Sequence, residues 1–284
     1  MSWLHRHRSA TPWLLLAPGL VWLAIFFVLP LGYLGYQSLQ DETFPRYEFA
    51  WAFSNYSEAI SENREQLVRS FLYAALATAI AVVVSYPLAY WIAFRAGRWK
   101  NVFLVLVVAP FFVTYLIRTV AWQTILADQG FVVDALQAIG VLADDGRLLA
   151  TSTAVVAGIT YNYLPFMVLP IYVSLEQVDE RLHQAAGELY ASPVQTFLRV
   201  TLPLSLPGVF AGRLLTFIPA AGDFINAELL GGPGQQMIGN VIQSKFLSLI
   251  DYPAAAALSF VLMLLIVAVI ATYARVFGSE RLTS

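Results

Sequence analysis

Apolar residues run through this chain in six long stretches separated by short polar segments. The stretches cover approximately residues 12–36, 67–94, 102–126, 148–175, 204–230 and 252–276. A helix needs roughly 20 apolar residues to cross a hydrocarbon core about 30 Å thick, and each stretch reaches that length. None shows the strict alternation of apolar and polar positions that is typical of the strands of a membrane barrel. The pattern therefore predicts an all-α integral membrane protein with six transmembrane helices.

Composition supports this prediction and excludes other classes. Hydrophobic residues make up 59% of the chain and charged residues 12%, whereas ordinary globular domains have roughly 45–50% and about 25%. The net charge of −2 gives no basic excess that would favour nucleic acid. Cysteine is absent, and the three histidines, His5, His7 and His183, are too scattered to predict a metal site. We expect one transmembrane domain over residues 1–284, with no metal.

The short connecting segments predict the orientation. Basic residues lie before the first stretch, between the second and third, and after the sixth: Arg6, Arg8, Arg95, Arg98, Lys100, Arg275 and Arg281. The alternate segments are acidic and include Asp41, Glu42, Glu58, Asp128 and Asp144. Because basic residues favour the cytoplasmic side, we expect both termini to be cytoplasmic. The longest cytoplasmic segment then spans residues 176–203.

This segment has the pattern of two short helices. Asp179 precedes a helix-forming stretch in which apolar and small residues recur at helical spacing, and Ser192 followed by Pro193 is typical of a second helix start. Phe197 and Val200 give the second helix a small apolar face, and we expect Pro203 to end it. Such a pair suits a surface that docks into another protein. The alternative is a helix pair that lies on lipid.

Residues 184–208 resemble the EAA loop of ABC-importer permeases. The matching residues are Ala185, Ala186, Ala191, Ser192, Phe197, Leu202, Pro203 and Pro207. Gln184 stands where the family has glutamate, and Tyr190 stands where it has glycine. In that family the loop is a coupling helix that inserts into the ATPase subunit, so the resemblance implies a coupling role for Gln184, Ala185, Ala186, Tyr190, Ala191, Ser192, Phe197 and Pro203.

Further segments, residues 116–122, 222–233, 237–241 and 251–253, are similar to the spermidine/putrescine permeases of the same family. The resemblance implies a type I importer permease, the first of two homologous permease subunits, in a bacterial inner membrane. It implies two ATPase subunits that bind ATP and magnesium, and an extracytoplasmic substrate-binding protein. This chain itself would hold no cofactor and would move polyamines by alternating access.

Ionisable residues inside a membrane are costly and usually face a cavity or a partner. The predicted fifth span contains two carboxylates, Asp223 and Glu228, beside helix-breaking residues such as Pro219 and Gly222. On an unbroken helix the two carboxylates would lie about 140° apart, whereas Asn226 would share a face with Asp223. Two carboxylates in an apolar wall suit an organic polycation.

Aromatic residues could hold ammonium groups through cation–π contacts. Span three places Tyr115 and Trp122 on one helix face, and span four carries Tyr161, Tyr163 and Phe166. Tyr161 and Tyr163 point to different sides of a regular helix, so one of them is expected only to pack. Trp122 also fits the aromatic belt at a membrane boundary.

Arg118 lies on the same face as Tyr115 and Trp122. A fixed cation would repel a cationic solute, so we expect it to pair with a carboxylate such as Glu228, to bind loop carbonyls, or to snorkel outward. Alternatively, Arg118 binds an anionic solute, and the chain imports a phosphonate or a carboxylate.

Catalytic motifs are missing. Residues 231–234 lack the Lys-Ser/Thr of a phosphate-binding loop, and neither His-Glu-x-x-His nor Gly-x-Ser-x-Gly occurs. We therefore predict a non-catalytic subunit, with ATP hydrolysis in a partner chain. Two other classes stay open: a gradient-driven secondary transporter that uses Asp223, and an anchor subunit that transports nothing.

Overall fold

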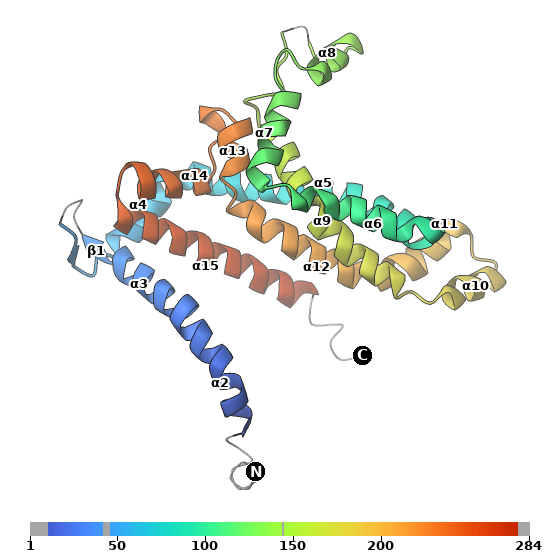
Figure 1. The fold of residues 1–284 in the computed structure, drawn as a ribbon, viewed down its shortest axis with the longest axis horizontal. Helices are drawn as coiled ribbons and strands as arrows, with labels where there is room; N and C mark the ends of the chain where they lie inside the picture. The colour runs from blue at the N-terminus through green and yellow to red at the C-terminus, as the bar shows by residue number, and fades with distance from the viewer. Residues whose placement is uncertain (1–10, 42–45, 144, 278–284) are drawn as a thin grey trace. The chain divides into compact units, whose positions relative to one another are not determined.

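The computed structural model describes residues 11–41, 46–143 and 145–277, and most of them are helical (Figure 1). Arg6, Arg8, Glu42, Asp144 and Arg281, which contributed to the predicted orientation, lie outside these residues. The chain divides into two compact units: residues 1–63 with 242–264, and residues 64–241 with 265–284.

Within the described residues, five helices are long and apolar enough to cross a membrane, and there are six candidate spans if a bent pair of helices is counted as one broken span. The five are Leu15–Ser38, Arg64–Phe94, Ser152–Glu176, Pro193–Ala221 and Tyr252–Arg275. The six predicted stretches are therefore all present, but the third and fifth differ from their predicted form.

In the first unit, one long helix is built from α2 (Thr11–Leu23), the π-turn η1 (Ala24–Val28) and α3 (Leu29–Ser38). A short antiparallel hairpin follows, with β1 (Gln40–Asp41) paired to β2 (Glu48–Phe49), and then α4 (Ser54–Glu62). Asn55 donates to the carbonyl oxygens of Ser38 at 3.0 Å and Gln40 at 2.8 Å, which fixes the chain where the span ends. The unit also contains the π-turn η6 (Ser244–Ser248) and the first part of α15 (Tyr252–Phe277).

The second unit is a bundle in which α9 (Ser152–Glu176) packs against both α5 (Arg64–Phe94) and α12 (Leu202–Ala221). Small residues permit the close approach of α12 and α9. A Cβ atom on Gly212 would lie 2.8 Å from the sulfur of Met167 and 3.2 Å from its Cα, so a larger residue would require Met167 to shift. Across the bundle, the hydroxyl groups of Tyr86 on α5 and Ser205 on α12 share a 2.7 Å hydrogen bond.

The third span, predicted over residues 102–126 as one of six transmembrane helices, is broken into two halves. The 3-10 turn η2 (Gly97–Trp99), α6 (Lys100–Val108) and the 3-10 turn η3 (Ala109–Phe112) form its first half, and α7 (Tyr115–Ile125) forms its second. The halves are bent by 95°. Pro110 supplies no backbone donor, and Val113 and Thr114 have extended backbone, so the hydrogen-bond ladder stops there. The short helix α8 (Phe131–Ala138) follows.

The fifth span, predicted over residues 204–230, begins earlier and ends sooner. Helix runs without a break from α11 (Pro193–Thr196) through the π-turn η4 (Phe197–Thr201) into α12. Pro203 therefore does not end a helix, contrary to the prediction. It lies in the first turn of α12, directly after a π-turn, where a missing amide donor is tolerated.

The predicted interruption near Gly222 is present. Helix α12 stops at Ala221, and the chain re-forms as three short pieces: α13 (Ile225–Leu230), the 3-10 turn η5 (Pro233–Gln235) and α14 (Ile238–Gln243). A Cβ atom on Gly239 would lie 2.7 Å from the carbonyl oxygen of Gly222. Glycine at 239 thus lets the start of α14 pack against the interruption.

Candidate functional site

The interruption after α12 builds a hydrogen-bonded cluster around Asp223. Its Oδ1 accepts from the backbone N–H of Asn226 at 2.8 Å, and its Oδ2 accepts from Asn226 Nδ2 at 3.0 Å. Tyr163 donates to the same Oδ2 at 3.3 Å, and Tyr115 donates a further hydrogen bond to it. Only 5% of Asp223 is exposed. The carboxylate thus ties α7 and α9 to the start of α13.

Two further residues extend this cluster. Asn162 donates from Nδ2 to Asn226 Oδ1 and to Thr119 Oγ1, both at 3.2 Å. The helices α9 and α13 come this close because residue 158 is glycine, where a Cβ atom would lie 2.6 Å from Asn226 Oδ1. Sequence reasoning placed Asn226 beside Asp223 but did not select Asn162. The signal available in the sequence was an amide side chain in the middle of an apolar span.

Arg118 is buried, with 8% of its surface exposed, and it is held by aromatic rings. Its guanidinium carbon lies 5.1 Å from the ring centroid of Phe111 and 5.5 Å from that of Tyr115. Its Nε and Nη1 have no acceptor among the described residues, and no ion pair forms there. The predicted pairing with a carboxylate or with loop carbonyls is therefore absent from the described chain, and burial also contradicts snorkelling.

Four rings surround this region and form what we call the aromatic box: Phe111, Tyr115, Tyr163 and Phe166. Ring centroids lie 5.0 Å apart for Phe111 and Phe166, 6.0 Å for Tyr115 and Tyr163, and 6.2 Å for Tyr163 and Phe166. Phe111, before the 95° bend of span three, and Tyr115, after it, contact the same guanidinium. Three of the predicted aromatic residues therefore meet beside Asp223.

Glu228 has a different environment. It lies on α13 with an exposed side chain, and its Oε2 accepts one hydrogen bond from Asn240 Nδ2 at 3.0 Å. Asn240 also donates to the carbonyl oxygen of Phe224 at 2.9 Å and accepts from the Met237 amide at 3.0 Å. As predicted, the two carboxylates face different surroundings. Asn240 was not selected from the sequence, although it lies in the similar segment 237–241.

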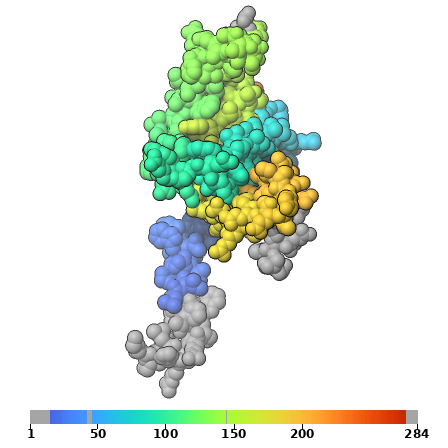
Figure 2. All heavy atoms as spheres, turned by 90° about the vertical axis from the view of Figure 1, so that its right-hand side faces the viewer, coloured from blue at the N-terminus to red at the C-terminus, as the bar shows by residue number. Residues whose placement is uncertain are grey.

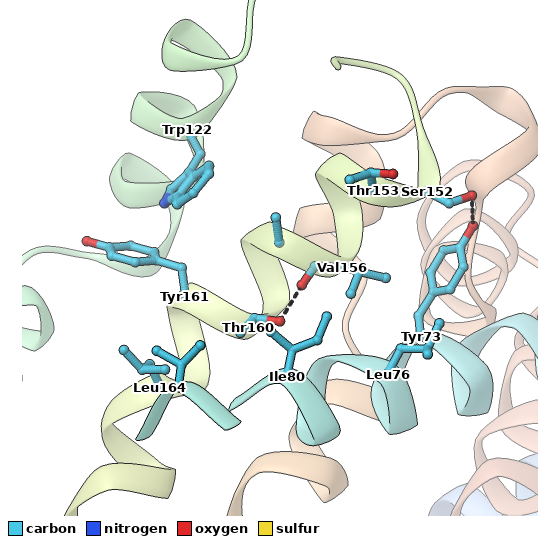
Figure 3. Close-up of a pocket in the computed structure, with 12 residues that line it drawn as sticks. Tyr73, Leu76, Ile80, Trp122, Ser152, Thr153, Val156, Thr160, Tyr161 and Leu164 are labelled. Carbon is cyan, nitrogen blue, oxygen red and sulfur yellow. Dashed lines mark hydrogen bonds between the residues drawn. The ribbon is translucent and has the colours of Figure 1, made fainter. Parts of the chain in front are cut away.

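Trp122 and Tyr161 lie elsewhere, at a groove between α5, α7 and α9 (Figure 3). Their ring centroids are 5.4 Å apart. The groove has a volume of about 510 Å³ and mostly apolar walls, and at its far end Tyr73 donates to Ser152 Oγ at 2.6 Å. As predicted, Tyr161 and Tyr163 face different sides of α9. The predicted pathway residues thus separate into the aromatic box, the groove and Glu228.

The two predicted helices of segment 176–203 are present, in the yellow region that faces the viewer in Figure 2. Asp179 accepts from the Arg181 amide at 2.9 Å and starts α10 (Glu180–Glu188). Ser192 and Gln195 form a reciprocal capping box at the start of α11. Both helix starts were predicted correctly.

Tyr190 ends α10 in a left-handed conformation, with φ of 56°. Its amide donates to the Gly187 carbonyl and the Ala191 amide donates to the Ala186 carbonyl, both at 3.0 Å. This is a Schellman motif, in which the left-handed position strongly favours glycine. The local geometry therefore explains why the resemblance expects glycine here. The Tyr190 side chain is 96% exposed.

Not all predicted coupling residues face outward. Gln184 and Ala185 are exposed, as is Ser192, whereas Ala191 is half-buried. Ala186 is buried against its own chain. The half-buried ring of Phe197 packs edge-on against Tyr86 and Tyr90 of α5, at centroid distances of 5.7 and 5.8 Å. Ala186 and Phe197 therefore shape this segment from inside, and the exposed residues Gln184, Ala185, Tyr190 and Ser192 are open to a partner.

Comparison with known proteins connects these features to a family. The family described as binding-protein-dependent transport system inner membrane component matches residues 9–277. The chain belongs to this family. It is similar to the spermidine/putrescine transport system permease protein PotB of Escherichia coli (strain K12), with 35% identity over 89% of this chain and 93% of that protein. PotB of Haemophilus influenzae is 36% identical over 89% of this chain and 90% of that protein.

A solved structure shares the fold. The permease superimposes on a chain of the bacterial alginate ABC transporter, in complex with alginate pentasaccharide-bound periplasmic protein, with a TM-score of 0.73 and 18% identity. That match covers 100% of this chain and 99% of the other. The fold is therefore that of a type I ABC-importer permease.

Family membership settles the class of function. The protein is an inner-membrane permease of an ABC importer and a transport component rather than a catalytic enzyme. A gradient-driven secondary transporter and an anchor that transports nothing are both inconsistent with this class. The solute and the residues that contact it are not decided by membership alone.

Proposed function

We propose that this permease carries polyamines into the cytoplasm as the first of two permease subunits. The observation that carries the proposal is similarity over most of the chain to proteins named as spermidine/putrescine permeases. The chemistry of the site agrees with it. Glu228 is an exposed carboxylate with no cationic partner among the described residues, and a polyamine brings protonated amines that need negative counter-charge when they lose water.

The proposed assembly contains a second homologous permease, two ATPase subunits that bind ATP and magnesium, and an extracytoplasmic substrate-binding protein. Both termini face the cytoplasm, and so does the segment of α10 and α11. This segment presents exposed apolar side chains to a partner: Leu182, Leu189, Tyr190, Val194 and Leu198. An apolar surface of this kind, with Gln184 and Ala185 beside it, suits the ATPase rather than water.

Within this assembly, each part of the permease has a defined task. The Asp223 cluster fixes the angle between α7, α9 and α13, and it thereby positions Glu228 at the exposed side of α13. ATP-driven movement of α10 and α11 reaches the bundle because helix continues unbroken from α11 into α12. Movement of α12 in turn displaces the interruption at its end, where the candidate site lies.

Uptake into proteoliposomes tests the substrate class. The full complex with its binding protein is supplied with ATP inside the vesicles and with labelled spermidine, putrescine, a phosphonate or a dicarboxylate outside. We expect ATP-dependent uptake of the polyamines only. Uptake of an anion with no polyamine uptake would refute the proposal and favour the alternative, in which Arg118 serves an anionic solute.

A matched pair of variants tests the coupling surface. Ala185→Asp puts a carboxylate on the exposed face of α10, so we expect a folded complex that has lost most of its substrate-stimulated ATP hydrolysis. Ala186→Asp buries that carboxylate inside the permease, so we expect reduced yield and a lower melting temperature. If Ala185→Asp transports normally, this face of α10 does not contact the ATPase.

Tyr190→Gly serves as the control for this pair. A non-glycine residue in the left-handed region costs about 1–2 kcal/mol, and glycine removes that cost while offsetting part of it through backbone entropy. We expect unchanged coupling and a slightly higher melting temperature. Severe loss of coupling would show instead that the exposed Tyr190 ring contacts the ATPase.

A further inference from the structure

The guanidinium of Arg118 lies against two ring faces of the aromatic box. Phe111 lies before the bend of span three and Tyr115 after it, and the ring faces of both contact the one guanidinium of Arg118. The hydroxyl group of Tyr115 donates to Asp223. The guanidinium of Arg118 thus contacts the ring of Tyr115, and the hydroxyl group of the same ring bonds to the carboxylate of Asp223. Tyr115 therefore lies between the two charges.

The hydrogen bonding of these two charges is unequal. Asp223 accepts hydrogen bonds from three residues, whereas Nε and Nη1 of Arg118 are buried without an acceptor among the described residues. A permanent structural arginine normally satisfies its donors, because a buried charge without hydrogen bonds is costly. Among the described residues, the guanidinium of Arg118 therefore lies against the ring faces of Phe111 and Tyr115 with no acceptor for Nε or Nη1, and a ring-face contact is one that another cation can replace.

The aromatic box has the chemistry of a site for an organic ammonium ion. Ring faces attract such cations. The hydroxyl groups of Tyr115 and Tyr163 also bond to the carboxylate of Asp223, so a negative charge lies next to these two rings. The opposite side is open, since Phe111 is 38% and Phe166 37% exposed. A primary ammonium group that arrives along the exposed side of the Phe111 ring would meet the position now filled by the guanidinium.

We propose that Arg118 is a resident cation that occupies an ammonium-binding position in the aromatic box, and that a protonated primary amine displaces it. The ligand class is a primary alkylammonium ion, with the ring faces of Phe111 and Tyr115 as its direct contacts. The link to transport rests on the proposed polyamine function, but the binding site itself does not. While Arg118 fills the box, the permease holds no solute there, and displacement frees the arginine to move with the bent half of span three.

The first experiment measures binding without transport. Arg118→Ala empties the position, and the assembled complex is melted in rising concentrations of methylammonium or n-propylammonium chloride, without binding protein or polyamine. We expect the melting temperature of the variant to rise with concentration and that of the unmodified complex to stay constant. Arg147→Ala is the matched control, because it removes an exposed arginine whose Nε lies 3.0 Å from Asp128. Sodium chloride at equal ionic strength controls for salt.

The result is decisive in either direction. Equal shifts in the Arg118→Ala, Arg147→Ala and unmodified complexes would overturn the proposal, and so would no shift in any of them. If Arg118→Ala does not assemble, Arg118→Gln replaces it in the same measurement, because glutamine fills part of the volume but carries no charge.

The second experiment connects the site to transport. In complexes with Arg118→Gln, we expect the polyamine concentration for half-maximal ATPase stimulation to fall severalfold, because the competing internal cation is gone. A severalfold increase would overturn the proposal and make Arg118 a positioning residue. If polyamines stimulate neither complex, the proposed function fails, while the alkylammonium melting experiment still decides whether the box binds ammonium ions.

Discussion

Two carboxylates lie five positions apart at the interruption of the fifth span, and their surroundings are opposite. Asp223 is buried and receives hydrogen bonds from Tyr115, Tyr163 and Asn226. Glu228 is exposed and receives one hydrogen bond, from Asn240. Similar side chains thus have different tasks, because a carboxylate surrounded by donors holds structure together whereas one that faces outward can meet a solute.

The comparison shows that a carboxylate can carry a charge without being available to bind a solute. The sequence predicts the same role for both carboxylates, as counter-charges for a cation. In the structure, the hydrogen-bond acceptors of Asp223 are already in use, so a solute would have to displace existing hydrogen bonds to reach it. The outward face of Glu228 requires no such exchange. We therefore expect substitutions at the two positions to affect different measurements.

Asp223→Asn should have the largest effect. Asparagine loses the charge and turns an amide group toward existing donors, and each hydrogen bond to a charged group contributes about 1.5–3 kcal/mol. We expect a loss of about 2–4 kcal/mol in the stability of the complex, measured as a lower melting temperature and a lower yield in mild detergent. A stable, well-assembled variant that only loses uptake would show that Asp223 acts on the solute instead.

Glu228→Gln should have a smaller and different effect. Glutamine keeps the size and can still accept from Asn240, so we expect an unchanged melting temperature. Removal of the exposed counter-charge should lower polyamine uptake severalfold, compared at equal incorporated complex and with basal ATP hydrolysis as the control. Normal uptake would remove Glu228 from the solute path and with it the contrast with Asp223.

Tyr163→Phe should have the smallest effect. Its hydroxyl group donates to Asp223 at 3.3 Å, which is long for a hydrogen bond, and the other donors remain. We expect a loss of at most about 1 kcal/mol, seen as a small change in melting temperature beside Tyr115→Phe as the more damaging comparison. A loss as large as that of Asp223→Asn would mean that Tyr163 fixes the carboxylate.

Several features could be predicted because they depend on local sequence. The helix starts at Asp179 and Ser192 follow from capping side chains that bond to nearby amides. The interruption near Gly222 follows from glycine and proline beside an ionisable residue. The proximity of Asn226 to Asp223 follows from their spacing of three residues.

Other features could not be predicted because they depend on residues far apart in the chain. Arg118 was expected to pair with a carboxylate such as Glu228, yet the packing of the described helices brings no carboxylate within ion-pair distance of it. Ala186 and Phe197 match the coupling pattern, but contacts with the rest of the chain decided that they face inward. Asn162 and Asn240 became part of the site only through the packing of α9, α13 and α14.

By itself, the sequence determined that this chain lies in a membrane, which segments are apolar enough to cross it, and which importer family it resembles. Hydrophobic length and short motifs carry that information because they act over a few adjacent residues. Only the tertiary structure decided which carboxylate is buried, where span three bends, and which rings enclose Arg118. Burial and hydrogen-bond partners arise from segments that meet in space, and spacing along one helix does not encode that meeting.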